Sequence, residues 1–230
     1  LNINKNYKKY LFKNLLIDKK KFNLYKLSNS RVYTNTNDVA YIDKNNLIQD
    51  STSIQLRGNK NSKISNNYIF KHGTPKFIKK IHSNVFSLLC GASGNDNYYH
   101  WFFDVLPRYY LFKKAIDIKS KDFFVVPNIK HEFQRETLRL LKIKNIINAY
   151  KVNHVQAKNI YVSNLKFSAN KFPPKWIIKE HKKYFLKKNK FINNKNKINI
   201  YISRKDSINH HREILNEKEL LNILKKRNFK

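Results

Sequence analysis

The sequence is poor in cysteine, glycine, methionine and acidic residues. Its 230 residues include one cysteine, four glycines, no methionine, and 15 Asp and Glu against 48 Lys and Arg. Because Cys90 is alone, the sequence excludes an internal disulfide and any metal site built from several thiolates, and it fits a reducing compartment. No apolar run of about 18 residues or more occurs, so we predict no membrane-spanning helix.

The shortage of acids gives the chain a formal net charge of +33. A charge of this size often indicates a partner that carries phosphates. Only 8 of the basic residues are Arg, however, and 33 residues are Asn, which is the usage expected of a very AT-rich coding sequence. Lysine spread over every segment is a weaker sign of nucleic-acid binding than a patch that contains arginine. We therefore expect no nucleic-acid partner, although the charge favours anionic ligands in a concave site.

Strand-like and helix-like patterns alternate along most of the chain. Residues 1–30 are rich in Lys and Asn and predict a poorly ordered or helical arm. Beyond them, strands at residues 85–90 and 123–127 and an amphipathic helix at residues 131–143 favour an α/β layered domain with a largely parallel sheet. We assign this domain to residues 31–190.

A second α/β domain is predicted to begin near the end of the chain. Residues 191–197, almost all Asn and Lys, are the best candidate for a linker. Residues 198–230 contain a predicted strand and then a helix, which a capping box of Asn216 and Glu219 would open. Because one strand and one helix cannot bury their own apolar faces, we interpret them as the truncated start of that domain.

Four polar residues share one side of a predicted helix after residue 95: Asn97, His100, Asp104 and Arg108. At 100° per residue they fall within about 80°, and the remaining surface is apolar. Such a helix is mostly buried, so the polar residues form either an internal hydrogen-bonded brace or the floor of a cleft. In a cleft, His100 and Asp104 offer a general base with an orienting partner, and Arg108 could hold a phosphate. Pro107 should kink or end the helix.

Two loops are further candidates for anion binding. Residues 91–94, with glycine at both ends, precede this helix and form either an anion-binding helix N-terminus or a tight turn between strand and helix. Arg204 and Arg212 lie in the loop after the strand at residues 198–203, where they bind phosphates or remain solvated charges. The histidines lack the spacing of a zinc site, so no structural zinc is expected.

Two sequence blocks resemble those of glycosyltransferase family 61, formerly called DUF563. Residues 97–108 read NYYHWFFDVLPR, which is similar to the N-Y-x-H-W-hydrophobic-x-D/E-x-L-P-R block of that family. Residues 201–204, YISR, followed by residues 212–217, REILNE, resemble a second block of the same family. The two blocks occur in the family's order, about a hundred residues apart.

The resemblance implies an inverting glycosyltransferase with a GT-B-like, Rossmann-type fold that uses a nucleotide-sugar donor, a glycan or lipid-linked polysaccharide acceptor and no bound metal or other cofactor. Bacterial relatives commonly serve capsular or other surface polysaccharide synthesis. His100 and Asp104 become the catalytic candidates, with Asp104 preferred as the base. The remaining matched positions become candidates for binding the substrate or donor: Asn97, Trp101, Arg108, Arg204, Arg212, Asn216 and Glu217.

The alternative function is a non-catalytic basic α/β module that binds nucleic acid or anionic polysaccharide. Its support is the charge and the 14 Tyr and 16 Phe that could stack on bases or sugars. A non-catalytic relative that acts as a scaffold is a third interpretation. We favour a bacterial, cytoplasmic enzyme peripheral to the inner membrane, because lysines attract anionic leaflets. The chain begins with Leu1 rather than Met, which leaves a signal or anchor upstream open, and without the rest of the second domain it is expected to be inactive alone.

Overall fold

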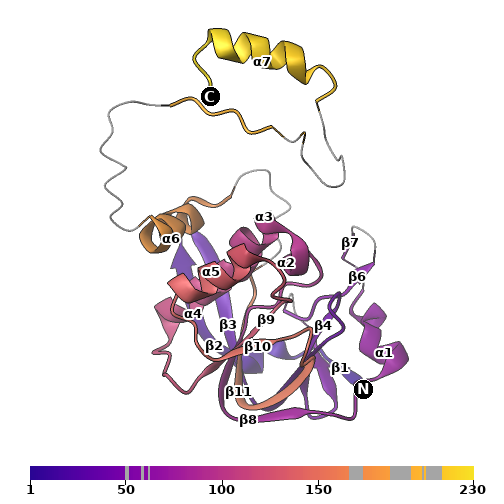
Figure 1. The fold of residues 1–230 in the computed structure, drawn as a ribbon. Helices are drawn as coiled ribbons and strands as arrows, with labels where there is room; N and C mark the ends of the chain where they lie inside the picture. Colours follow the sequence, from indigo (N-terminus) through magenta and orange to yellow (C-terminus); the bar gives the residue numbers. More distant parts are fainter. Residues whose placement is uncertain are drawn as a thin grey trace. The chain divides into compact units, whose positions relative to one another are not determined.

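The computed structural model describes residues 1–49, 52–57, 60, 61, 63–165, 173–186, 198–203, 205 and 214–230 (Figure 1). The chain divides into two compact units, Leu1–Lys187 and Lys188–Lys230, and each is described by itself. The predicted linker at residues 191–197 lies outside the described residues. In the described part of the chain, no helix combines the length and the apolar character that crossing a membrane requires.

A mixed sheet of nine strands forms the centre of the first unit. Its order is β1 (Asn2–Asn4), β5 (Asn46–Ile48), β4 (Val39–Asp43), β3 (Lys20–Thr34), β11 (His154–Ser163), β8 (Lys79–Ser87), β9 (Phe123–Val126) and β10 (Ile146–Asn148), with β2 (Leu11–Ile17) also paired to β3. Strands β11, β8, β9 and β10 are parallel, whereas β3 is antiparallel to β2, β4 and β11. A separate two-stranded sheet pairs β6 (Leu56–Arg57) with β7 (Lys60–Asn61). Strand β1 is also parallel to β5. The prediction of an α/β fold is confirmed, but the sheet is mixed rather than largely parallel, because β3 and β4 pair antiparallel with their neighbours.

The prediction of a poorly ordered or helical arm over residues 1–30 is wrong. The chain there forms β1, β2 and most of β3, with the short 3-10 helix η1 (Tyr7–Tyr10) between the first two. Asp18 and Lys19 connect β2 to β3, and their φ angles are +48° and +61°. Two consecutive left-handed residues form the turn whose twist matches a hairpin. In β3, Phe22, Leu24 and Leu27 are buried, so these residues belong to the core.

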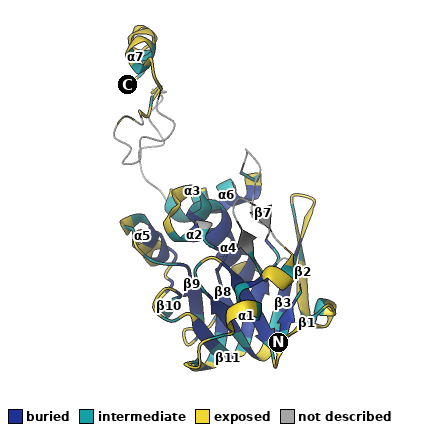
Figure 2. Ribbon diagram, turned by 90° about the vertical axis from the view of Figure 1, so that its right-hand side faces the viewer, coloured by how far each residue is buried: buried dark blue, intermediate teal, exposed yellow. Residues whose placement is uncertain are grey.

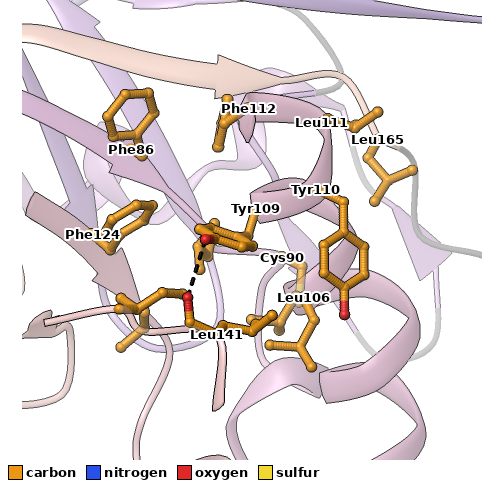
Figure 3. Close-up of a cluster of buried hydrophobic side chains, with 14 of the residues drawn as sticks. Phe86, Cys90, Leu106, Tyr109, Tyr110, Leu111, Phe112, Phe124, Leu141 and Leu165 are labelled. Atoms are coloured by element: carbon orange, nitrogen blue, oxygen red, sulfur yellow. Dashed lines mark hydrogen bonds between the residues drawn. The ribbon is translucent and has the colours of Figure 1, made fainter. Parts of the chain in front are cut away.

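The helices of the first unit pack against the sheet in two groups, because Ile69 of α1 (Tyr68–His72) belongs to a smaller cluster with Tyr33 and Ile42 and the longer helices share another. Further helices are α2 (Ser93–Asp96), α3 (Tyr98–His100), the π-helix η3 (Trp101–Val105), α4 (Leu106–Ala115), α5 (Glu132–Leu140) and α6 (Lys175–Phe185), with the 3-10 helix η2 (Ile64–Asn66) before α1. Figure 2 shows α4 as the most deeply buried of the longer helices. Buried residues of α4, α5 and α6 share one hydrophobic cluster with Phe86 and Phe124 of the sheet (Figure 3). Their neighbours Val85 and Val125 belong to a second cluster, as the alternation of side chains along a strand requires.

The second unit contains α7 (Glu217–Lys226). The strand predicted at residues 198–203 is present only as one parallel bridge between Asn199 and Phe229. Asn216 precedes α7, but its side chain accepts no hydrogen bond from the helix backbone, so the predicted capping box is not formed. The Asn216 amide instead donates to the Glu219 carboxylate, at 3.4 Å.

Candidate active site

The candidate site is built on the segment that follows β8. The chain leaves this strand, turns through Gly91, and continues as α2, α3, η3 and α4 without a long loop. The Asn97 side chain begins α3 by accepting a hydrogen bond from the His100 backbone N–H, at 3.2 Å. This cap satisfies a backbone donor at the helix start and fixes the entry of His100. The predicted strand, glycine turn and helix unit is therefore confirmed, and Asn97 serves as its cap.

The turn at residues 91–94 is closely packed and needs glycine at both ends. Gly91 has φ +83°, which a residue with a side chain rarely adopts. A Cβ on Gly94 would lie 2.6 Å from the Cys90 sulfur and 2.9 Å from a Val105 methyl carbon. Because α2 has only four residues, we do not assign it an anion site. The tight turn is the interpretation that fits these contacts.

Replacing Gly94 with alanine is expected to lower the free energy of unfolding by about 1–3 kcal/mol, the usual cost of overpacking a full core. The new methyl group would push against Cys90 and Val105, and Val105 lies within η3. Urea denaturation of the variant measures the effect. Gly73→Ala is the contrasting variant, because a Cβ there meets no atom within 4 Å and its cost comes from the φ angle of +69° alone. Gly94 belongs to α2 and its φ is not positive, so a loss in Gly94→Ala reports the crowding. Wild-type stability in Gly94→Ala would contradict the prediction.

His100 and Asp104 form the shortest polar contact of the site. His100 Nδ1 lies 2.6 Å from Asp104 Oδ2, across one turn of the helix. The Asp104 side chain is 1% exposed and the His100 side chain is 18% exposed. A carboxylate can only accept a hydrogen bond, so Nδ1 carries the proton. The bond also fixes the orientation of the imidazole ring. The predicted pair is thus brought together, with the imidazole as the more accessible member.

Arg108 is not placed to hold a phosphate. The residue is 1% exposed and its guanidinium donates to the backbone oxygens of Ser163 and Leu165, at 3.1 and 2.8 Å. A third bond reaches the Ser163 hydroxyl, at 3.2 Å. These partners are the last residue of β11 and a residue just beyond it, so Arg108 braces the helix against the sheet. The structure thus turns the donors of Arg108 inward and gives its predicted role in ligand binding no support.

Trp101 is also a structural residue. It is fully buried, and its indole N–H donates to the Thr137 hydroxyl on α5, at 2.9 Å. The ring therefore joins two helices within the core, and the structure gives the predicted contact with substrate no support. A buried indole usually satisfies its N–H in this way.

The remaining predicted residues belong to the second unit. Glu217 accepts hydrogen bonds from the Ser203 and Tyr201 hydroxyls, both at 2.7 Å. These bonds, with Ser203 the larger influence, hold the pKa of the Glu217 carboxyl below its usual range. Its carboxylate thus connects residues 201–203 to the start of α7. Arg204 and Arg212 lie outside the described residues.

One residue near the site was missed from the sequence. His181 of α6 lies with Nε2 2.9 Å from the Phe102 carbonyl oxygen of η3 and Nδ1 2.9 Å from the Tyr110 hydroxyl of α4. Burial lowers the pKa of His181 to about 4 and keeps the ring neutral. No spacing in the sequence indicates this contact, because residues 102 and 181 lie far apart in the chain.

Stability is expected to fall as the pH drops from about 6.5 to 4. His181 has an ordinary pKa when the chain is unfolded and a lowered one when it is folded, so protons favour the unfolded state over that range. The loss should approach about 2 kcal/mol after allowance for partial exposure of the ring. Melting temperatures of wild type and His181→Gln across this range measure it, and the exposed His82→Gln is the control. A parallel decline in His181→Gln and wild type would contradict the assignment.

A family model described as glycosyltransferase 61 matches residues 98–230 of this chain, which is more than half of it. The chain belongs to glycosyltransferase family 61. It is therefore a glycosyltransferase, an enzyme that moves a sugar from a donor to a glycan acceptor. No curated protein and no solved structure matched the chain.

The match to family 61 includes the segment that carries the candidate site. It begins at residue 98, so it contains His100 and Asp104 and the whole of α7. Among the described residues, no group of three or more His, Cys, Asp or Glu side chains is arranged to hold a metal ion.

Proposed function

We propose that this family 61 enzyme is an inverting glycosyltransferase in which His100 is the general base and Asp104 orients it. The observation that carries the proposal is the 2.6 Å contact between His100 Nδ1 and the buried Asp104 carboxylate. With the proton on Nδ1, the basic lone pair is on Nε2. Since the carboxylate is the buried member, we prefer His100 as the base, which reverses the preference drawn from the sequence.

The proposed reaction is a single displacement. As the acceptor oxygen attacks the anomeric carbon, its proton passes to His100 Nε2 and the new C–O bond forms. The bond from that carbon to the donor phosphate breaks, and its electron pair leaves with the nucleoside diphosphate. The buried Asp104 carboxylate stabilises the imidazolium that results. Attack opposite the leaving group inverts the configuration at this carbon.

The positive charge for the leaving group is proposed to come from Arg204 and Arg212. A guanidinium matches the geometry of a diphosphate, and cationic groups stabilise charge that develops on it. We propose on this basis that the reaction needs no bound metal, and that the second unit begins the nucleotide-sugar-binding domain of a GT-B-like enzyme. The first unit would then carry the acceptor side.

The proposed setting is surface polysaccharide synthesis by a bacterial, cytoplasmic enzyme that lies against the inner membrane. The net charge of +33 supports contact with an anionic surface, to which each nearby lysine contributes about 1 kcal/mol. A lipid-linked polysaccharide acceptor would be presented at the same surface. A purely binding module is the weaker alternative, because the chain belongs to a family of enzymes.

The first test is turnover by the full-length protein with a panel of nucleotide sugars, with and without EDTA. We expect donor consumption, transfer to a glycan acceptor, inversion of the anomeric configuration in the product's NMR spectrum, and rates that EDTA changes less than about twofold. Folded protein that neither binds nucleotide nor turns it over would overturn the proposal. Activity that EDTA abolishes and Mn²⁺ restores would overturn its metal-free part alone.

A further inference from the structure

The π-helix η3 contains one carbonyl group that the helix itself cannot satisfy. The Leu106 N–H, which would bond Phe102 in an α-helix, bonds the Trp101 oxygen instead. The next residue, which would donate to Phe102 in a π-helix, is Pro107 and has no N–H. Leaving a carbonyl group without a donor in the interior costs free energy. Phe102 therefore needs a donor from another element.

His181 of α6 supplies that donor. Its Nε2 lies 2.9 Å from the Phe102 oxygen, and a carbonyl oxygen can only accept, so Nε2 carries the proton. Nδ1 is then the acceptor for the Tyr110 hydroxyl, at 2.9 Å. The two bonds fix both the tautomer and the orientation of the ring. They connect α6, η3 and α4 at one point.

Aromatic rings hold His181 in this position. Its ring centroid lies 5.3 Å from Phe102, 5.5 Å from Phe103 and 5.6 Å from Phe185, with the first two in edge-to-face contact. Tyr110 contacts the same ring at 5.5 Å. The surroundings leave the imidazole little freedom to turn, so the bond to Phe102 is a fixed part of the local structure.

The register of η3 determines where the catalytic pair lies. His100 immediately precedes η3 and Asp104 is inside it, so the backbone turns between them are the turns of the π-helix. If the segment returned to α-helical hydrogen bonding, the direction of Asp104 relative to His100 would change. Arg108 fixes the far side of this segment to β11, and Asn97 caps its near side. Within η3, the Trp101 indole is bonded to Thr137, and the bond from His181 satisfies the Phe102 carbonyl that the π-turn leaves open.

We propose that His181 is a positioning residue for glycosyl transfer, acting by holding the π-turn that aligns His100 with Asp104. The inference rests on the proposed function of that pair. Nothing in the role of His181 requires contact with either substrate. A loss of this bond should therefore affect the chemical step more than substrate binding.

The test compares variants of the full-length protein by kinetics and by NMR. His181→Phe removes the donor and keeps the ring, His181→Gln restores an N–H donor, and Tyr110→Phe removes only the bond to Nδ1. Phe185→Leu is the packing control, because it contacts the same ring without a hydrogen bond in the described structure. The NMR readout is the low-field resonance of the His100 Nδ1 proton, which needs no turnover.

We expect His181→Phe to lower kcat by about 10- to 100-fold, with donor and acceptor KM within about twofold, and to weaken the His100 resonance. His181→Gln should recover most of the rate, Tyr110→Phe should lose about threefold, and Phe185→Leu should lose less. An unchanged kcat and resonance in folded His181→Phe would overturn the inference. If that variant does not fold, His181→Leu, which also lacks the donor, takes its place, and an unchanged kcat and resonance there overturn the inference. If wild type itself lacks transferase activity, the proposed function fails and the resonance alone decides whether His181 positions the pair.

Discussion

Replacing His100 with alanine is expected to lower kcat for transfer by about a thousandfold while nucleotide binding persists. Removal of a general base typically costs between 10² and 10⁴ in rate, and the proton of the attacking hydroxyl would have no other acceptor in this position. Because the buried Asp104 carboxylate loses the His100 donor, circular dichroism of the variant is needed to show that it is folded. Steady-state kinetics, together with calorimetric titration of the nucleoside diphosphate, measure both quantities.

Asp104→Asn separates the two roles within the pair. An amide keeps the size of the carboxylate but not its charge, so the imidazolium loses its stabilising partner and the ring loses its preferred tautomer. We expect a loss comparable with that of His100→Ala and little further loss in the double variant, because the residues act as a unit. His72→Ala, at an exposed histidine, is the control. If His100→Ala keeps a tenth of the activity and Asp104→Asn keeps none, Asp104 is the base.

Arg108→Met is expected to lower the free energy of unfolding by about 3–5 kcal/mol. Methionine fills much of the volume but leaves the oxygens of Ser163 and Leu165 without their charged donor in a buried place. Both oxygens lie where β11 ends, so the contact between α4 and the sheet weakens directly. Arg108→Lys should recover part of the loss, because one ammonium cannot reproduce the fork of a guanidinium.

Urea denaturation followed by circular dichroism measures these changes in Arg108 variants. Arg139→Met on the exposed surface of α5 is the matched control and should change stability by less than about 0.5 kcal/mol. A loss below about 1 kcal/mol in Arg108→Met would show that water or another donor replaces the guanidinium. That result would also reopen Arg108 as a ligand-binding residue.

Local patterns in the sequence predicted several elements well. The helix α5 follows from its amphipathic spacing, α7 lies where a helix was expected after residue 216, and β9 follows from a short apolar run before a proline. That His100 and Asp104 lie on one side of a helix follows from their four-residue spacing, although the π-helical register between them does not. Each of these features depends on residues close in sequence, which is why the pattern alone sufficed.

Features that depend on distant residues could not be predicted in the same way. The β2–β3 hairpin turns at Asp18 and Lys19, a pair without the glycine that usually marks such a turn, so residues 1–30 suggested an arm. The short α1 has too few residues to show a helical pattern, although the Asn67 side chain caps it by accepting from the Ile69 N–H. Within the site, the polar stripe did not distinguish the inward-facing Arg108 from the accessible His100, because that depends on packing against β11 and α5.

The pairing of β3 with β11 has a consequence for synthesis of the chain. Leu24 pairs with Ser163 and Tyr33 with His154. The edge of β3 that pairs with β11 therefore has no partner until more than a hundred further residues have been translated. At about 5–20 residues per second, this edge stays open on the ribosome for roughly 6–30 s. Residues 98–230 alone, the part that matches the family, would lack both β3 and β8, the two strands that flank β11. Lysines along β3, such as Lys20, Lys21 and Lys26, protect the nascent strand during that interval, because like charges oppose pairing between neighbouring chains.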